Sequence, residues 1–179
     1  MFEMLKMKGL RKGQIGLTLI ELVIVIGLTA AVVGGITMTI MQVLNMNART
    51  RNDMVAVYQV RQAGKLVTED VLEGQYVTAG GTSGFPLTIN WTDWGTNDKH
   101  QVVYTLDPPS GGPSILWRKY YLNSTLNSTT KVAEYIDPDQ TSCAPPGVLT
   151  GGVLTFNVTA TVGEQSKTEV YQISPRPGS

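Results

Sequence analysis

The sequence contains one cysteine and one histidine in 179 residues, and this scarcity excludes several kinds of chemistry. The single Cys143 cannot form a disulfide within one chain. A zinc cluster or a Cys/His nucleophilic pair would have to combine His100 and Cys143 with unusual partners. No HExxH, GxSxG or phosphate-cradling P-loop motif occurs. We therefore expect that the protein is not an enzyme and that it has no catalytic residue, metal or cofactor.

The 14 basic and 14 acidic side chains balance overall, but they are distributed unevenly. Residues 1–16 carry four basic side chains and one acidic side chain, so the rest of the chain is mildly acidic. Nothing after residue 16 forms a basic stripe that could neutralise a phosphate backbone. We do not expect nucleic acid as a partner of the soluble part.

Charge is also scarce between Leu17 and Leu44, where Glu21 is the only ionisable side chain. A helix of this length would measure about 42 Å, which exceeds the roughly 30 Å apolar thickness of a bilayer. The sequence therefore predicts a transmembrane helix over residues 17–44. A carboxylate inside such a span is unfavourable without a partner, and this makes Glu21 a candidate functional residue.

Basic residues are denser before this span than after it, where Arg49 and Arg51 are offset by Asp53. The positive-inside rule then places the N-terminus in the cytoplasm and the C-terminal part on the other side of the membrane. A secretory signal peptide is the competing interpretation, because residues 29–31 offer a weak cleavage-like patch. Such signals have an apolar stretch of only about 7–15 residues, and the run here is longer.

The basic leader, Gly16 and the following LTLIEL carry a family resemblance. Together they resemble the class III signal of type IV prepilins and type II secretion pseudopilins. In that family a membrane peptidase cuts after the glycine and methylates the new N-terminus. The resemblance implies a cleaved leader over residues 1–16, cleavage between Gly16 and Leu17, N-methylation of Leu17, and Glu21 as the acidic residue of the motif. Cleavage after Gly13 would move Glu21 out of the family's register.

This resemblance implies a structural subunit, a minor pilin or pseudopilin, of a type IV pilus or type II secretion pseudopilus. The implied partners are prepilin peptidase, other pilin or pseudopilin subunits and an inner-membrane assembly platform. The implied location is the bacterial inner membrane, crossed once, and then the filament. The alternative is an unpolymerised single-pass anchor that carries an extracytoplasmic binding domain.

Cleavage after Gly16 would release an amine at the membrane boundary, close to the Glu21 carboxylate. A buried ammonium and a buried carboxylate are each unfavourable unless they are paired. We expect Glu21 to meet the Leu17 amine of a neighbouring subunit. The alternative is a carboxylate that reaches interfacial water by itself.

Small residues recur every fourth position in the span, at Gly27, Ala31 and Gly35, with a second pair at Ala30 and Gly34. Such a stripe lets the backbones of two helices approach closely in lipid. Glycine is also frequent in transmembrane helices in general, so the pattern can occur without association. We assign helix packing to Gly27, Ala31 and Gly35 as a prediction.

An amphipathic continuation of the helix is predicted over residues 45–74. Its apolar face comprises Val57, Val60, Ala63, Val67 and Val71. The charged residues between them are expected to face solvent: Arg61, Lys65, Glu69, Asp70 and Glu73. Gly64 weakens a helix by about 1 kcal/mol relative to alanine, and Gly74 is a plausible terminator.

Residues 75–179 form a β-rich head in this interpretation, since short apolar runs alternate with turn residues. The expected strands cover residues 86–91, 101–106, 115–122, 131–136, 152–161 and 167–173. An antiparallel sheet whose one face takes the apolar stripe of the helix gives an α+β fold. The family resemblance adds the ladle shape of pilins. The order of the head segments more weakly resembles J-type minor pseudopilins and related minor pilins.

Two further features of the head leave alternatives open. Asp137 and Asp139 could contribute to a calcium site, but a turn explains them better because no spaced ligand loop accompanies them. A set of aromatic residues could form a sugar or partner platform, although their strand spacing is more typical of a core. The set comprises Trp91, Trp94, Tyr104, Trp117, Tyr120 and Tyr121.

Overall fold

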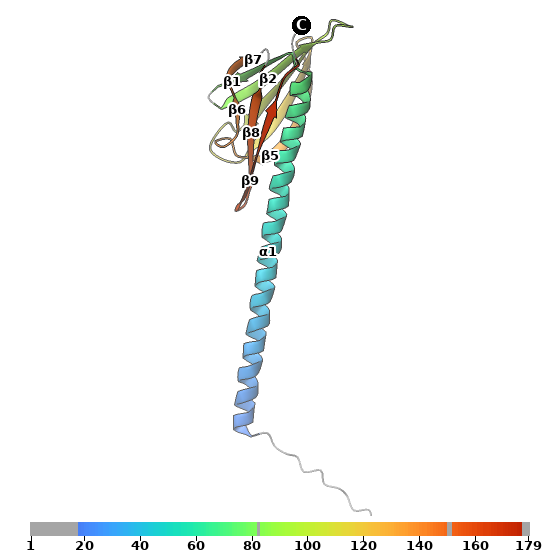
Figure 1. Ribbon diagram of the computed structural model, residues 1–179. Coiled ribbons are helices and arrows are strands. Elements are labelled where there is room, and N and C mark those ends of the chain that lie inside the picture. The colour runs from blue at the N-terminus through green and yellow to red at the C-terminus, as the bar shows by residue number, and fades with distance from the viewer. Residues whose placement is uncertain (1–17, 82, 150–151, 177–179) are drawn as a thin grey trace, which may run out of the picture. The chain divides into compact units, whose positions relative to one another are not determined.

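The computed structural model describes residues 18–81, 83–149 and 152–176, and over these it has an α+β fold with one long helix and an antiparallel sheet (Figure 1). Helix α1 spans Leu19–Glu73. The strands are β1 (Tyr76–Gly80), β2 (Gly84–Thr92), β3 (Lys99–Asp107), β4 (Ser114–Leu122), β5 (Thr125–Ile136), β6 (Ser142–Ala144), β7 (Gly147–Leu149), β8 (Leu154–Val162) and β9 (Gln165–Ile173). The predicted cleavage and methylation at Gly16 and Leu17 lie outside the described residues.

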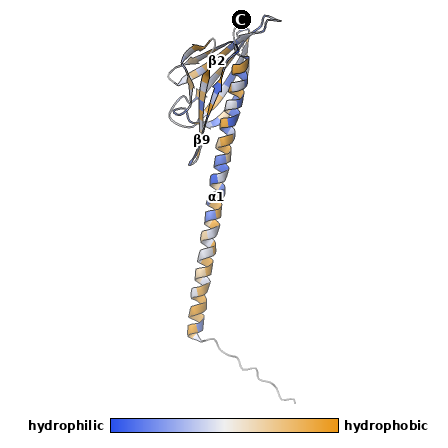
Figure 2. Ribbon diagram, viewed as in Figure 1, coloured by the Kyte–Doolittle hydropathy of each residue, from blue (hydrophilic) through white to orange (hydrophobic). Residues whose placement is uncertain are grey.

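The chain divides into two compact units, one ending at Asn45 and the other beginning at Met46. In the first unit, every described residue of α1 is exposed. Figure 2 shows that this part of the helix is mostly hydrophobic. By length and composition the helix is able to cross a membrane.

Three threonines within the apolar part of α1 satisfy their hydroxyl groups inside the helix. The hydroxyls of Thr29, Thr37 and Thr39 each donate to the carbonyl oxygen four residues earlier, at 2.7, 2.9 and 2.9 Å. Such bonds leave no free hydroxyl donor facing hydrocarbon. The threonines are therefore compatible with a lipid-facing helix.

In the second unit, one face of α1 is buried against the sheet. The buried residues are Ala56, Val60, Ala63, Gly64, Val67, Asp70 and Val71. They recur at intervals of three and four, as one helix face requires. Four of the five predicted apolar positions belong to this face, and Val57 lies at its partly exposed edge.

The helix ends where the sheet begins. The backbone N–H of Gly74 donates to the carbonyl of Asp70 at 3.0 Å, and the N–H of Gln75 already donates to Asn90 of β2 at 2.9 Å. A side chain at position 74 would collide with Ile89, so glycine allows this close approach. The chain then continues as strand β1, which pairs antiparallel with β2.

The sheet is an antiparallel meander from β1 to β5, followed by β8 and β9. Strand β8 pairs with β9 along its length, and it also pairs with the end of β5 and with β6. Strand β7 pairs with β1 at the other end of the order. The short segment that holds β6 and β7 therefore links the two ends of the sheet.

The core lies between the second half of α1 and one face of the sheet. Its largest fully buried side chains are Tyr104, Phe156, Leu87, Ile89, Leu116, Ile136 and Leu154. Cross-strand rows place Leu87 beside Tyr104, and Ile89 beside Val102. Short apolar runs between turn residues predicted six of the strands, and the residues of these strands alternate between this buried face and the other face of the sheet.

Gly64 has a packing role that helix propensity alone does not reveal. A Cβ at this position would overlap the ring of Tyr171 on β9. The β8–β9 hairpin also forms exposed ion pairs with α1, including Lys167 to Asp53 at 3.0 Å and Glu169 to Arg61 at 3.5 Å. The glycine thus lets β9 pack closely against the helix.

Candidate functional site

The N-terminal end of α1 forms a capping box between Thr18 and Glu21. The backbone N–H and the hydroxyl of Thr18 donate to the Glu21 carboxylate at 3.4 and 3.3 Å, and the Glu21 N–H donates to the Thr18 hydroxyl at 3.4 Å. These distances are at the long end for hydrogen bonds. A negative charge is also favourable at this end of a helix. Glu21 therefore has a local but weak set of partners within its own chain.

The small residues of the span form an open surface in the single chain. Gly27, Ala31 and Gly35 are all exposed, and a Cβ placed on either glycine would meet nothing within 4 Å. Gly34 has the same open surroundings. The predicted packing stripe is thus accessible to another helix.

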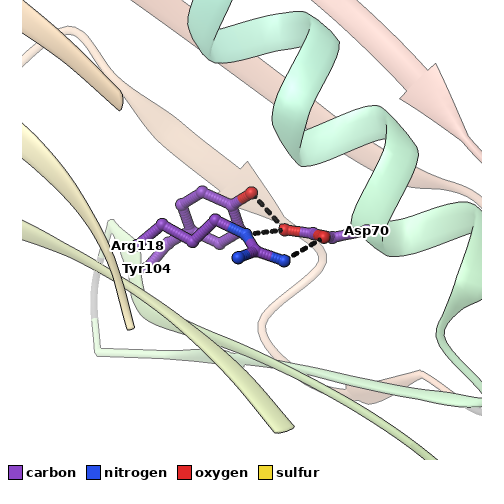
Figure 3. A network of polar contacts seen from close by, with 3 residues as sticks. All are labelled: Asp70, Tyr104 and Arg118. Carbon is purple, nitrogen blue, oxygen red and sulfur yellow. Dashed lines mark hydrogen bonds and ion pairs between the residues drawn. The ribbon is translucent and has the colours of Figure 1, made fainter. Parts of the chain in front are cut away.

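Asp70 is buried at the sheet side of α1, which corrects the prediction that it belongs to a solvated face (Figure 3). Its two carboxylate oxygens accept hydrogen bonds from Nε and Nη2 of Arg118 on β4, each at 2.7 Å. The hydroxyl of Tyr104 on β3 donates to the same carboxylate. A buried carboxylate is tolerated here because it has both a bidentate cation and a hydroxyl donor.

The surroundings of the network shift two of its pKa values. Burial, and then the Asp70 carboxylate, raise the pKa of Tyr104 well above its ordinary value. The hydrogen bonds to Asp70 raise the pKa of Arg118. These two pKa shifts favour a neutral Tyr104 phenol and a charged Arg118 guanidinium.

An aromatic group lies on the same sheet face, next to this network. Trp91 of β2 stacks on His100 of β3 with ring centroids 5.0 Å apart and an interplanar angle of 4°. The hydroxyl of Tyr120 on β4 lies 2.8 Å from Nδ1 of His100. The Arg118 guanidinium lies 5.7 Å from the Tyr120 ring centroid, within cation–π range. The three rings therefore form one ordered group.

These rings line a cleft of about 680 Å³, a volume within the usual range for small-molecule sites of roughly 300–1,000 Å³. The lining also includes Glu73 at the end of α1, Arg118 and Arg176. Trp94 contributes a side chain that is 70% exposed. We call this feature the aromatic cleft.

The six aromatic residues that the sequence suggested as a sugar or partner platform fall into three groups by their location. Trp91, Trp94 and Tyr120 line the aromatic cleft. Tyr104 is fully buried and belongs to the core. Trp117 and Tyr121 alternate with Arg118 and Tyr120 along β4, so they lie on the opposite face of the sheet.

Asp137 and Asp139 occupy a turn. One Asp137 oxygen accepts the backbone N–H groups of Asp139 and Gln140 at 3.0 and 3.2 Å. Within the described ranges, no group of three or more His, Cys, Asp or Glu side chains is arranged to hold a metal ion. Cys143 is buried, and this burial raises the pKa of its thiol to about 12.

The charge pattern of the sequence assigned Asp70 to the solvated face and did not predict its pairing with Arg118, although a signal for the pairing exists. Asp70 follows Val67 by three positions and Ala63 by seven, which places it on the apolar helix face. Arg118 lies between Leu116 and Tyr120 on the inward side of an alternating strand. Two opposite charges at inward positions could have suggested a buried pair.

No protein-family model matches this chain, and neither does any curated protein or solved structure.

Proposed function

We propose that this chain is a structural subunit, a minor pilin or pseudopilin, of a type IV pilus or type II secretion pseudopilus. The observation that carries the proposal is the exposed apolar first half of α1, with Glu21 as its only charge, in the third position of the helix. This residue keeps the register with Gly16 that the prepilin-like signal requires. The proposed role is assembly and not catalysis.

Helix packing is the proposed mechanism. Leader removal leaves an amine on Leu17, and Glu21 of an adjacent subunit pairs with it. The hydrogen bonds from Thr18 to the Glu21 carboxylate are long and therefore weak. A charged partner would replace them with little loss of favourable interaction energy. The open stripe of Gly27, Ala31 and Gly35 would then allow close helix contact along the same interface.

The proposal includes location and shape. The subunit would sit in the bacterial inner membrane with its N-terminus in the cytoplasm and its head outside, before extraction into the filament by an assembly platform. A hydrophobic handle joined to an α+β head would give the ladle shape of pilins. The helix and the sheet described above support both parts separately.

Mass spectrometry of the full-length protein, co-expressed with a prepilin peptidase, tests the proposal. The expected product has lost residues 1–16 and carries a methyl group on the Leu17 amine. Gly16→Leu should remain uncut, whereas the matched control Gly13→Leu should be processed normally. An intact N-terminus in the wild-type protein would overturn the proposal.

The second candidate is a single-pass anchor whose head binds a ligand without polymerising. The aromatic cleft is the observation that favours it. The two candidates differ in one measurable respect, because an anchor would be absent from purified filaments.

A further inference from the structure

We propose that the aromatic cleft of the head is a saccharide-binding site. The inference goes beyond filament assembly and does not depend on it. It rests on an uncovered part of the inner sheet face, on the balance of charges around it, and on the rigidity of the side chains that line it.

The cleft exists because the inner sheet face continues past the end of α1. The helix ends at Glu73, and Gly74 already packs on Ile89. Trp91 and His100 form the next inward row of β2 and β3, beyond the helix end. Figure 1 shows these strands extending past α1. Helix α1 therefore does not cover this stretch of the core-facing surface. It carries Trp91, His100 and Tyr120, whereas the part that α1 covers is lined mainly by aliphatic residues together with Tyr104 and Phe156.

The charges around the rings disfavour a strongly charged ligand. Glu73 and Asp93 supply two carboxylates, and Arg176 and Arg118 supply two guanidinium groups, of which Arg118 is already paired with Asp70. An anion would meet the carboxylates and the negative end of the helix, whereas a cation would meet the guanidinium groups. An apolar ligand would desolvate all four polar groups without replacing their hydrogen bonds.

A sugar ring satisfies these constraints together. Its apolar C–H face can pack on an aromatic ring while its hydroxyl groups stay in contact with water or polar side chains. Tryptophan and tyrosine side chains suit such a ligand, because each combines an apolar ring with a polar group. The sugar's hydroxyl groups both donate and accept, so they match carboxylates and guanidinium groups at the same time. The cleft volume of about 680 Å³ lies within the range of small-molecule sites.

The lining is preorganised by contacts outside the cleft. Asp70 holds Nε and Nη2 of Arg118, which leaves Nη1 directed away from Asp70 in Figure 3. Within the lining itself, Tyr120 also holds His100 through its hydroxyl group. Fixed donors and rings reduce the entropy that binding would otherwise lose.

Trp94 is held in a hydrogen-bonded turn although its side chain is exposed. Within this turn, the backbone N–H of Asn97 donates to the carbonyl of Asp93 at 2.7 Å, and the N–H of Gly95 donates to the Asp93 side chain at 2.8 Å. Asn123 of the neighbouring turn donates to the Asp98 carboxylate at 2.8 Å, and this bond lowers the pKa of Asp98. A rigid turn therefore presents a large aromatic side chain at the rim of the cleft.

The test uses the full chain in a detergent without a sugar head group. The protein is applied to an array of bacterial, plant and animal oligosaccharides, and hits are titrated by tryptophan fluorescence. We expect saturable binding to at least one oligosaccharide. Trp94→Ala should weaken it at least tenfold, and the control Trp117→Phe, on the other face of the sheet, should leave it unchanged.

Two variants that each neutralise one glutamate provide a second measurement that leaves the aromatic rings unchanged. Glu73→Gln should weaken binding several-fold, while Glu69→Gln, one turn earlier and outside the cleft, should not. Absence of binding across the array would overturn the proposal. Sugar binding that neither Trp94→Ala nor Glu73→Gln changes would also overturn it. If the protein binds no sugar and Trp94→Ala instead abolishes contact between subunits, the cleft would be assigned to a protein partner and the proposal would be overturned.

Discussion

Asp70 in the last turns of α1 accepts both hydrogen bonds of the Arg118 fork, each at 2.7 Å. The side chains of this pair are 9% and 22% exposed, so the two charges are largely removed from water. The pair joins the end of the helix to β4, and through Arg118 it also reaches the aromatic cleft. One contact therefore serves both the packing of the head and the geometry of its open face.

Replacing Asp70 with alanine should destabilise the head by about 3–5 kcal/mol, because the change leaves a mostly buried guanidinium and the Tyr104 hydroxyl without their acceptor. Chemical denaturation of the detergent-solubilised chain, followed by tryptophan fluorescence, measures the effect. Glu69→Ala removes only an exposed ion pair with Lys65 and should change stability by less than about 1 kcal/mol. Equal effects of the two variants would contradict the structural role of Asp70.

Gly64→Ala should destabilise the head by about 1–3 kcal/mol, because the added methyl group overlaps the Tyr171 ring. Helix propensity alone predicts the opposite sign, a gain of about 1 kcal/mol. In a Tyr171→Ala background the clash is absent, so the same substitution should become neutral or stabilising. A double-mutant cycle by denaturation checks this change of sign, and additivity of the two changes would refute the packing explanation.

Cys143 should resist alkylation in the folded protein. Burial raises the pKa of its thiol from an ordinary 9.0 to about 12, so at pH 8 roughly one thiol in ten thousand is ionised. Because the folded pKa lies above the unfolded one, the associated stability is fully present below pH 9 and is lost as the pH rises toward 12. Iodoacetamide labelling with and without denaturant measures the difference, and equal rates would show that the thiol is accessible.

Glu21→Gln should reduce incorporation into filaments about tenfold, since loss of an ion pair contributing roughly 1.4 kcal/mol changes an equilibrium by that factor. Cleavage of the leader should be unaffected. Thr18→Ala removes the hydroxyl of the capping box but retains the carboxylate, so it serves as the matched control and should assemble nearly as well as wild type. Quantifying each variant in sheared filaments gives the result; unchanged incorporation of Glu21→Gln would exclude the proposed charge pair.

Local patterns in the sequence anticipated much of the fold. The apolar run predicted the exposed first half of α1, and the three- and four-residue spacing of Val60, Ala63, Val67 and Val71 predicted the buried face of the second half. Short apolar runs separated by turn residues predicted six strands. Strands β1, β6 and β7 were missed because they are three to five residues long, too short for a recognisable alternation. Strand β5 begins six residues earlier than expected, since Thr125–Thr130 are exposed and all polar except Leu126.

The sequence by itself determined which segments suit lipid and which helix face is apolar, because each of these properties depends on neighbours along the chain. The resemblance of residues 13–28 to a prepilin signal stays a prediction. Only the tertiary structure decided that Asp70 is buried, that Gly64 accommodates Tyr171, and that Trp91, His100 and Tyr120 share an open cleft. The physical reason is that these contacts join residues far apart in sequence, and strand order and register decide which side chains meet.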